Sequence, residues 1–197
     1  MKNKKYILIF IFLFSFFIAF AIAGLKLPYE QNKSLNITQG YDGVSHQKTD
    51  FYALDFGKEC GEAYGLPVLA SYTGKVITVS ENHKVGETKS YGNFVLIDHG
   101  NNILSRYAHL KKVFVKEGEN IVQGQQVGEI GNTGTIITSC IGETRGTHLH
   151  FAMYQKQTDG TFLAYKPEPI SGFNNLVAGM TLASDNILVQ KSQPQGL

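Results

Sequence analysis

Between its apolar amino terminus and its last residues, the chain has no stretch with the sustained 3.6-residue apolar period of an amphipathic helix, which argues against a helical domain. It also has no cluster of lysine and arginine, so nothing in its charge pattern favours nucleic acid or an anionic membrane as a partner. Disordered tracts and internal repeats are likewise missing. These absences leave a folded, strand-rich domain as the expected class.

The amino terminus is a strongly hydrophobic segment. Three lysines within the first five residues precede an apolar run from Tyr6 to Ala23, which ends in the small-residue pattern Ala-Ile-Ala. This order of features predicts an export signal with cleavage after Ala23. An uncleaved membrane anchor is the alternative, because a run of 18 residues is at the lower limit of what spans a bilayer. We therefore expect the protein outside the cytosol, in the periplasm or the medium.

Cleavage would leave 174 residues, which suffice for one domain with a substantial core. Without the three signal lysines, 15 Lys and Arg stand against 16 Asp and Glu, a formal charge of −1. We expect the domain over residues 24–170 and a carboxyl-terminal extension over 171–197 that wraps around it. Residues 191–197 are expected to be loose.

Short apolar runs separated by Gly and Asn predict an all-β domain of antiparallel strands and hairpin loops that forms a substrate cleft. Runs of this length fit strands better than helices, and 21 glycines supply tight turns. The expected strands are Leu35–Thr38, Tyr52–Phe56, Val68–Ser71, Gly74–Val79, Phe94–Asp98, Ile103–Tyr107, Gln126–Ile130 and His148–Tyr154.

One glycine-spaced segment, Val113 to Gly134, has the hairpin character of a biotinyl or lipoyl carrier. A carrier needs an exposed lysine at the hairpin tip, and the corresponding stretch Gly128 to Gly134 contains none. We therefore interpret the segment as a β-hairpin without a cofactor.

The chain has two cysteines, Cys60 and Cys140. In an exported protein a lone pair is more often bridged than free, so we expect a disulfide. Two unrelated buried thiols are the alternative. A bridge would connect two segments that flank the polar residues described next.

The segment Gly-Thr-His-Leu-His-Phe at 146–151 is the sharpest local signal for a functional site. Residues two apart in a strand share a face, so His148 and His150 project to one side while Leu149 and Phe151 enter the core. Two imidazoles on one face indicate a metal site, with surface histidines as the alternative.

A second polar group lies far upstream, where His46 is followed by Asp50 and Asp55. In the predicted strand Leu54 and Phe56 belong to the apolar face, which leaves Asp55 on the open face. A partly buried carboxylate needs a partner. A cation held by His46 and a downstream histidine would provide one.

His109 interrupts apolar residues at the end of a predicted strand, in Arg-Tyr-Ala-His-Leu at 106–110. By itself such a residue is more often a hydrogen-bonded structural histidine than a catalytic one. The remaining histidines, His83 in a polar loop and His99 in a turn, are expected to have structural or solvated roles.

Taken together, these segments resemble the lysostaphin-type M23 metallopeptidases over about residues 37 to 155. Six blocks occur in the order of the family, which makes the match highly specific. The blocks are His46 through ALDF, GLPVLASYTGKV at 65–76, YGNFVLIDHG at 91–100, RYAHL at 106–110, GQQVGEIGNTG at 124–134 and GTHLHF at 146–151.

The resemblance implies a zinc-dependent endopeptidase that hydrolyses peptide cross-links of bacterial peptidoglycan. It implies that His46, Asp55 and His150 bind one zinc ion with a position left open for water or substrate, and that His109 and His148 are the catalytic histidines. Many members have the aspartate four residues after the first histidine, so Asp50 is the alternative ligand. The sequence ALDF followed by GLPVLA favours Asp55.

This chain also departs from the family pattern by an insertion from Ile136 to Arg145, before GTHLHF. The insertion carries Cys140, so we expect it to form a wall of the cleft that is fixed by a bridge to Cys60.

Two other functions use similar features. Some M23-like domains have lost zinc ligands and activate cell-wall amidases, whereas all five expected positions are occupied here. Iron-dependent oxygenases also use two histidines and one carboxylate. Their carboxylate usually lies in a local His-x-Asp or His-x-Glu, whereas Asp55 is nine residues from His46. The sequence therefore favours the peptidase.

Overall fold

The structure is a computed structural model that describes residues 23–87, 90–136 and 138–190. The export signal predicted over residues 1–23, except Ala23, and the end predicted to be loose, residues 191–197, lie outside these ranges. Among the described residues, no helix combines the length and the hydrophobicity needed to cross a membrane.

Eleven strands in this part of the chain form one antiparallel sheet, so the predicted all-β class is confirmed. The strands are β1 (Ser34–Gln39), β2 (Leu54–Gly57), β3 (Pro67–Leu69), β4 (Gly74–Ser80), β5 (Asn93–Asp98), β6 (Ile103–Val113), β7 (Asn120–Ile121), β8 (Gln126–Ile130), β9 (His148–Lys156), β10 (Phe162–Tyr165) and β11 (Thr181–Ala183). Two short 3-10 helices, η1 (Lys48–Asp50) and η2 (Glu59–Gly61), flank β2. Each predicted strand has a counterpart, and β7, β10 and β11 are additional.

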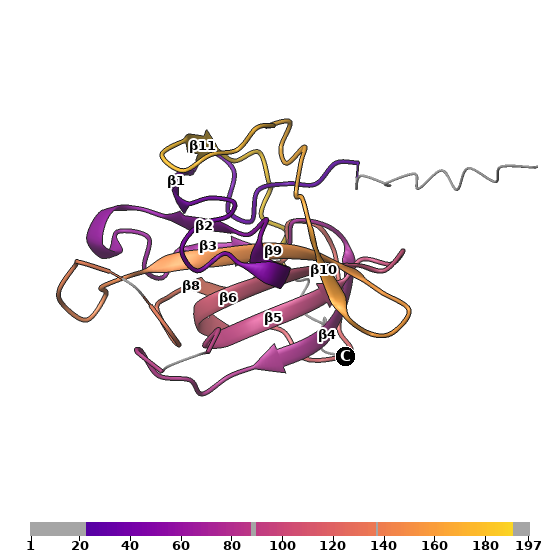
Figure 1. Ribbon diagram of the computed structural model, residues 1–197, viewed down its shortest axis with the longest axis horizontal. Helices are drawn as coiled ribbons and strands as arrows, with labels where there is room; N and C mark the ends of the chain where they lie inside the picture. The colour runs from indigo at the N-terminus through magenta and orange to yellow at the C-terminus, as the bar shows by residue number, and fades with distance from the viewer. Residues whose placement is uncertain (1–22, 88–89, 137, 191–197) are drawn as a thin grey trace, which may run out of the picture.

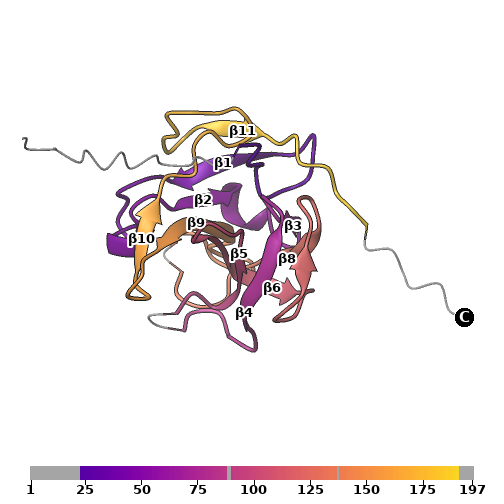
Figure 2. The ribbon, with the colours of Figure 1, turned by 90° about the vertical axis from the view of Figure 1, so that its right-hand side faces the viewer.

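The order of strands in the sheet brings distant parts of the chain together. It runs β11-β1-β2-β9-β6-β5-β4-β7, with β10 paired to β9 and β8 paired to both β6 and β3. Figure 1 shows β9, β6, β5 and β4 in succession below β2, β1 and β11. In the turned view of Figure 2, β3 and β8 lie on the side opposite β10. Strand β9 therefore runs between β2, which contains Asp55, and β6, which contains His109.

The alternation of side chains in β2 and β9 separates the core from the polar face. Leu54, Phe56, Leu149 and Phe151 are fully buried in the main apolar core. The alternate residues of β9 face the other side of the sheet, where Tyr154 belongs to a second, smaller apolar cluster. The predicted face assignment in both strands is therefore confirmed.

The segments at both ends of the described chain pack on the same edge of the sheet. Strand β11 pairs with β1, and Leu182 is buried in the main core beside Tyr29, whose hydroxyl donates to the Leu182 carbonyl at 2.9 Å. The buried Asn186 amide donates to the carbonyls of Leu27 and Ala70 at 2.9 and 3.2 Å. Because these amide groups are paired, the irregular tail can pack tightly without leaving unpaired polar groups.

Candidate metal centre and its cleft

Three side chains from separate segments meet at the polar face of β2 and β9. Asp55 and His150 are direct partners in the pairing of these strands, and His46 comes from the loop after β1. One ligand atom from each residue lies within 4.8 Å of the other two. Asp55 Oδ1 is 3.1 Å from His46 Nε2 and 3.0 Å from His150 Nδ1. All three residues are buried, so the polar atoms are held by the fold.

Contacts with the surrounding chain orient two of these residues. His46 Nδ1 lies 2.8 Å from the Gly40 carbonyl oxygen, which can only accept, so Nδ1 carries the proton and Nε2 keeps its lone pair toward Asp55. The second carboxylate oxygen of Asp55 accepts a hydrogen bond from the Gln39 amide at 3.2 Å. Such outer contacts fix the tautomer and the rotamer of metal ligands.

The donor set fits a zinc ion. Two imidazole nitrogens and one carboxylate oxygen are zinc ligands of the catalytic type, which leaves one position open. Ligand atoms about 2.0 Å from a tetrahedral ion lie about 3.3 Å from one another. The separations of Asp55 Oδ1 from the two imidazole nitrogens, 3.0 and 3.1 Å, are close to this value.

Charges at the site also favour a cation. Burial alone would lower the pKa of His150, but the Asp50 and Asp55 carboxylates outweigh it and raise this pKa to about 9. Burial alone would raise the pKa of Asp55, and His148, His150 and His46 together outweigh it and hold this pKa well below its usual range. The two carboxylates therefore stabilise positive charge between them, as a metal ligand set requires.

Asp50, the alternative ligand in the sequence, contacts the other nitrogen of His150. Its Oδ2 lies 3.8 Å from His150 Nε2, longer than a direct hydrogen bond, and this nitrogen is buried without a hydrogen-bond partner among the described residues. The hydroxyl groups of Tyr91 and Tyr154 both donate to the Asp50 carboxylate. Arg106 Nη1 is 3.9 Å from Oδ1. Asp50 is thus a fixed anion on the far side of the imidazole.

Arg106 belongs to the same partly buried group. Its guanidinium carbon lies 4.0 Å from the ring centroid of Tyr91 and 4.9 Å from that of Tyr154, and Nη1 donates to the Tyr154 hydroxyl at 2.8 Å. Tyr91, Arg106 and Tyr154 were not identified from the sequence as part of the site. A signal for Tyr154 was present, because the two-residue period of β9 places it on the face of His148 and His150.

Two further histidines approach the ligand set. The ring centroid of His109 lies 4.6 Å from that of His148 and 5.9 Å from that of His150. Both His109 and His148 place Nδ1 at 2.8 Å from a backbone carbonyl oxygen, of Thr133 and Gly146 respectively. Each Nδ1 therefore donates, so Nε2 is the nitrogen of each ring that is not committed to the backbone. Burial, with repulsion from His148 and His150, lowers the pKa of His109 to about 3.

A break in the alternation of β6 turns His109 toward the site. Tyr107 and Leu110, three residues apart, are both buried in the main core. His109 has a φ of 60°, and the pairing with β5 shifts register there. A bulge of this kind re-aims a side chain. The strand predicted to end at Tyr107 continues through the bulge to Val113, so the predicted end of this strand was wrong.

Asp55, His109, His148 and His150 line a cleft of about 520 Å³. His46 does not line it, because its side chain is completely buried. Loop residues complete the lining, among them Val44, which is 87% exposed. The other two histidines are elsewhere. His83 contacts Ser80 and Glu87, and His99 contacts the Thr73 carbonyl and Ser105, so both have hydrogen-bonded roles.

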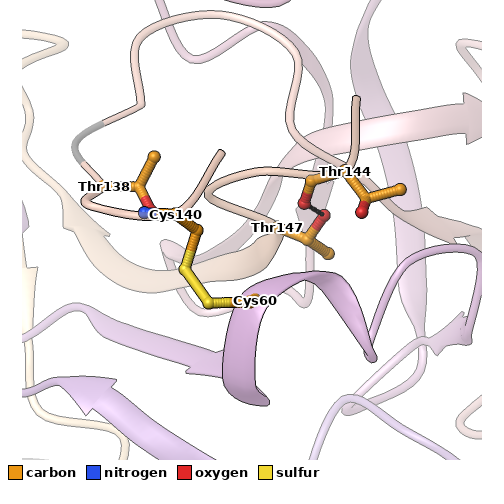
Figure 3. The surroundings of a disulfide bond; sticks show 5 residues. All are labelled: Cys60, Thr138, Cys140, Thr144 and Thr147. Atoms are coloured by element: carbon orange, nitrogen blue, oxygen red, sulfur yellow. Dashed lines mark hydrogen bonds between the residues drawn. A yellow bond between two sulfur atoms is a disulfide. The ribbon is translucent and has the colours of Figure 1, made fainter. Parts of the chain in front are cut away.

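The predicted disulfide is present. Cys60 and Cys140 are bridged across a sequence separation of 80 residues, with their Cα atoms 5.5 Å apart. Figure 3 shows the bridge between η2 and the inserted loop. The expected bridge from the insertion to Cys60 is therefore confirmed, whereas no described residue from Ile136 to Arg145 lines the 520 Å³ cleft itself.

Fold and site together define an all-β protein with a group of three side chains that could hold a metal ion and two additional histidines beside it. The sequence profile of Peptidase family M23 matches residues 52–161, more than half of the chain. The chain therefore belongs to Peptidase family M23, a zinc-dependent family. His46 and Asp50 precede the matched range, so their placement rests on the structure.

Individual relatives point to two kinds of protein. The chain is 35% identical over 108 residues to peptidoglycan DD-endopeptidase ShyA of Vibrio cholerae, a match that covers 55% of this chain and 22% of ShyA. It is 27% identical over 143 residues to murein hydrolase activator NlpD of Salmonella dublin, covering 71% of this chain and 36% of NlpD. The chain thus spans only about a fifth to a third of these relatives.

A solved structure supports the fold. The M23 metalloprotease pseudoalterin, from the deep sea, is similar with a TM-score of 0.56 and 18% identity, over 77% of this chain and 80% of that chain.

Proposed function

We propose that this protein is an exported zinc-dependent endopeptidase that hydrolyses peptide cross-links of bacterial peptidoglycan. The convergence of five side chains in and behind one cleft carries the proposal, since three form a candidate metal-ligand set and the other two, His109 and His148, have an Nε2 that is not committed to the backbone. The similarity to a peptidoglycan DD-endopeptidase supports the substrate class.

His46, Asp55 and His150 would hold the zinc ion. A bound zinc ion would polarise the peptide carbonyl and make water more acidic. The ligand atoms are already within 4.8 Å of one another, so little reorganisation accompanies binding. Asp50 would keep His150 in the tautomer with a proton on Nε2, which leaves Nδ1 free to bind the metal.

His109 and His148 would move protons. Peptide hydrolysis requires that the attacking water lose a proton and that the departing amine gain one. The Nδ1 atoms are committed to backbone carbonyls, so proton transfer takes place at Nε2. His109 stays neutral at all pH values well above its pKa of about 3, so its lone pair remains available over the working range.

The similarity to NlpD favours a second function, activation of a cell-wall amidase without hydrolysis by this chain. The two functions make different demands on the site. An activator needs the shape of the cleft, whereas an endopeptidase also needs the metal ligands and both proton-transferring histidines.

The test is mass spectrometry of muropeptides released from two chemically different peptidoglycans by the zinc-loaded full chain. We expect fragments cut within the peptide cross-links, and none after incubation with the His109→Ala variant. A chain that releases no such fragment but stimulates a purified amidase equally well with and without His109 would be an activator, and the endopeptidase proposal would be wrong.

A further inference from the structure

A second cavity adjoins the cleft beside His148. It encloses about 300 Å³ and shares His148 and Thr38 with the first cavity. The rest of its lining comes from Lys58 with η2 on one wall and from the loop between Thr138 and Thr147 on the other. A peptide that crosses His148 would continue into this cavity. Its volume is at the lower end of ligand pockets and suits a short peptide unit.

The two walls are joined, so the cavity is preformed. The Cys60–Cys140 disulfide links η2 to the loop (Figure 3). At Gly61 an added Cβ would lie 2.3 Å from Thr144 Oγ1, which shows that the backbone of η2 touches the loop directly. Behind the loop, the Asn132 amide donates to the Glu143 and Arg145 carbonyls at 2.9 and 3.0 Å.

Lys58 and Glu59 bring charge to a lining that otherwise consists of small residues, the disulfide and His148. Both are exposed, and within the described ranges neither side chain forms an ion pair or a hydrogen bond. By contrast, Lys26, Lys111 and Lys166 each pair with a carboxylate. The ammonium group of Lys58 is therefore free to pair with a ligand.

We propose that this second cavity is a substrate subsite for a peptide unit that carries a free carboxylate next to the scissile bond, and that Lys58 pairs with this carboxylate. The inference rests on the proposed peptidoglycan substrate, whose peptides carry free carboxylates beside their cross-links. The disulfide holds the opposing wall in place. Because Lys58 is exposed, its contribution is modest, about two- to fivefold in KM.

The test uses two cross-linked peptides that differ only in whether this carboxylate is free or amidated. The zinc-loaded full chain should have a KM about two- to fivefold lower for the free acid, with equal kcat. In Lys58→Ala this preference should vanish while kcat is retained. Lys75→Ala removes an equally exposed lysine from β4, three strands away from β9, and should keep the preference. Glu59→Gln should also keep it.

Equal KM for both peptides, or a preference that survives in Lys58→Ala, would overturn the subsite and leave the proposed function intact. A binding measurement separates the two ideas. Fluorescence anisotropy with labelled peptides and the zinc-loaded His109→Ala variant reports binding without hydrolysis. If the full chain hydrolyses neither peptide but this variant binds the free acid more tightly in a Lys58-dependent manner, the subsite stands and the endopeptidase proposal fails.

Discussion

The cleft has two halves that are held in different ways. In the metal half, Asp55 and His150 are neighbours in the pairing of β2 with β9, so backbone hydrogen bonds set their separation. In the half proposed to recognise the substrate, called the recognition half below, η2 faces an inserted loop that is mostly exposed. The disulfide fixes the distance between them, and Asn132 holds the loop from behind. A sheet places reacting groups accurately, whereas a cross-linked loop can change in sequence without disturbing them.

The comparison predicts that changes in the metal half abolish the chemistry and that changes in the recognition half alter binding. The largest expected effect is that of His150→Ala, which removes one of three protein ligands. We expect the zinc content after gel filtration, measured by mass spectrometry, to fall to background and hydrolysis to be lost. Asp55→Ala should behave in the same way.

Asp50→Ala and His83→Ala serve as the comparison variants, since neither residue belongs to the ligand set. Both should retain bound zinc at saturating concentration. Full zinc content in Asp55→Ala together with loss in Asp50→Ala would reverse the assignment of the aspartates.

The next effect separates ligands from proton-transferring groups within the metal half. His109→Ala and His148→Ala should each keep one zinc ion and lose about 10² to 10⁴ in hydrolysis rate, because a positioned general acid or base contributes about that much. Zinc content and peptide hydrolysis are measured on the same samples. A His148→Ala variant that lacks zinc would show that the roles of His148 and His150 are exchanged.

Asp50→Asn should have a smaller effect, a zinc affinity lowered by about 10- to 100-fold, as is typical when an outer partner of a ligand is removed. The measurement is competition with a chelator. The NMR resonance of the His150 Nε2 proton should shift as well, which a general loss of stability would not produce. Asp159→Asn, in an exposed turn, is the matched control. An unchanged zinc affinity in Asp50→Asn would show that Asp50 does not support the metal ligand.

The smallest effect on the chemistry should come from the paired substitution Cys60→Ser and Cys140→Ser in the recognition half. We expect the free energy of unfolding to fall by about 2 to 4 kcal/mol, with zinc content unchanged. Urea unfolding followed by circular dichroism measures this, since the chain has no tryptophan for fluorescence. Loss of zinc in the folded variant would show that the two halves are not independent.

Local patterns in the sequence determined much of this protein. The two-residue period places Leu149 and Phe151 in the core and therefore fixes the common face of His148 and His150. The same reasoning places Asp55 on the face of β2 opposite Leu54 and Phe56. The cysteine count and the predicted export signal indicated the bridge. These predictions succeed because they depend only on strand geometry and on residue chemistry that neighbours along the chain already define.

Only the tertiary structure decided the remaining questions. Strand alternation by itself would turn His109 away from the site, and the bulge in its pairing with β5 reverses this. The positions of the two aspartates around His150, a residue 95 positions after Asp55, also come from the structure alone, with Asp55 beside Nδ1 and Asp50 near Nε2. Register shifts and contacts across such separations arise from pairing and packing of whole strands, so no local pattern of residues contains them.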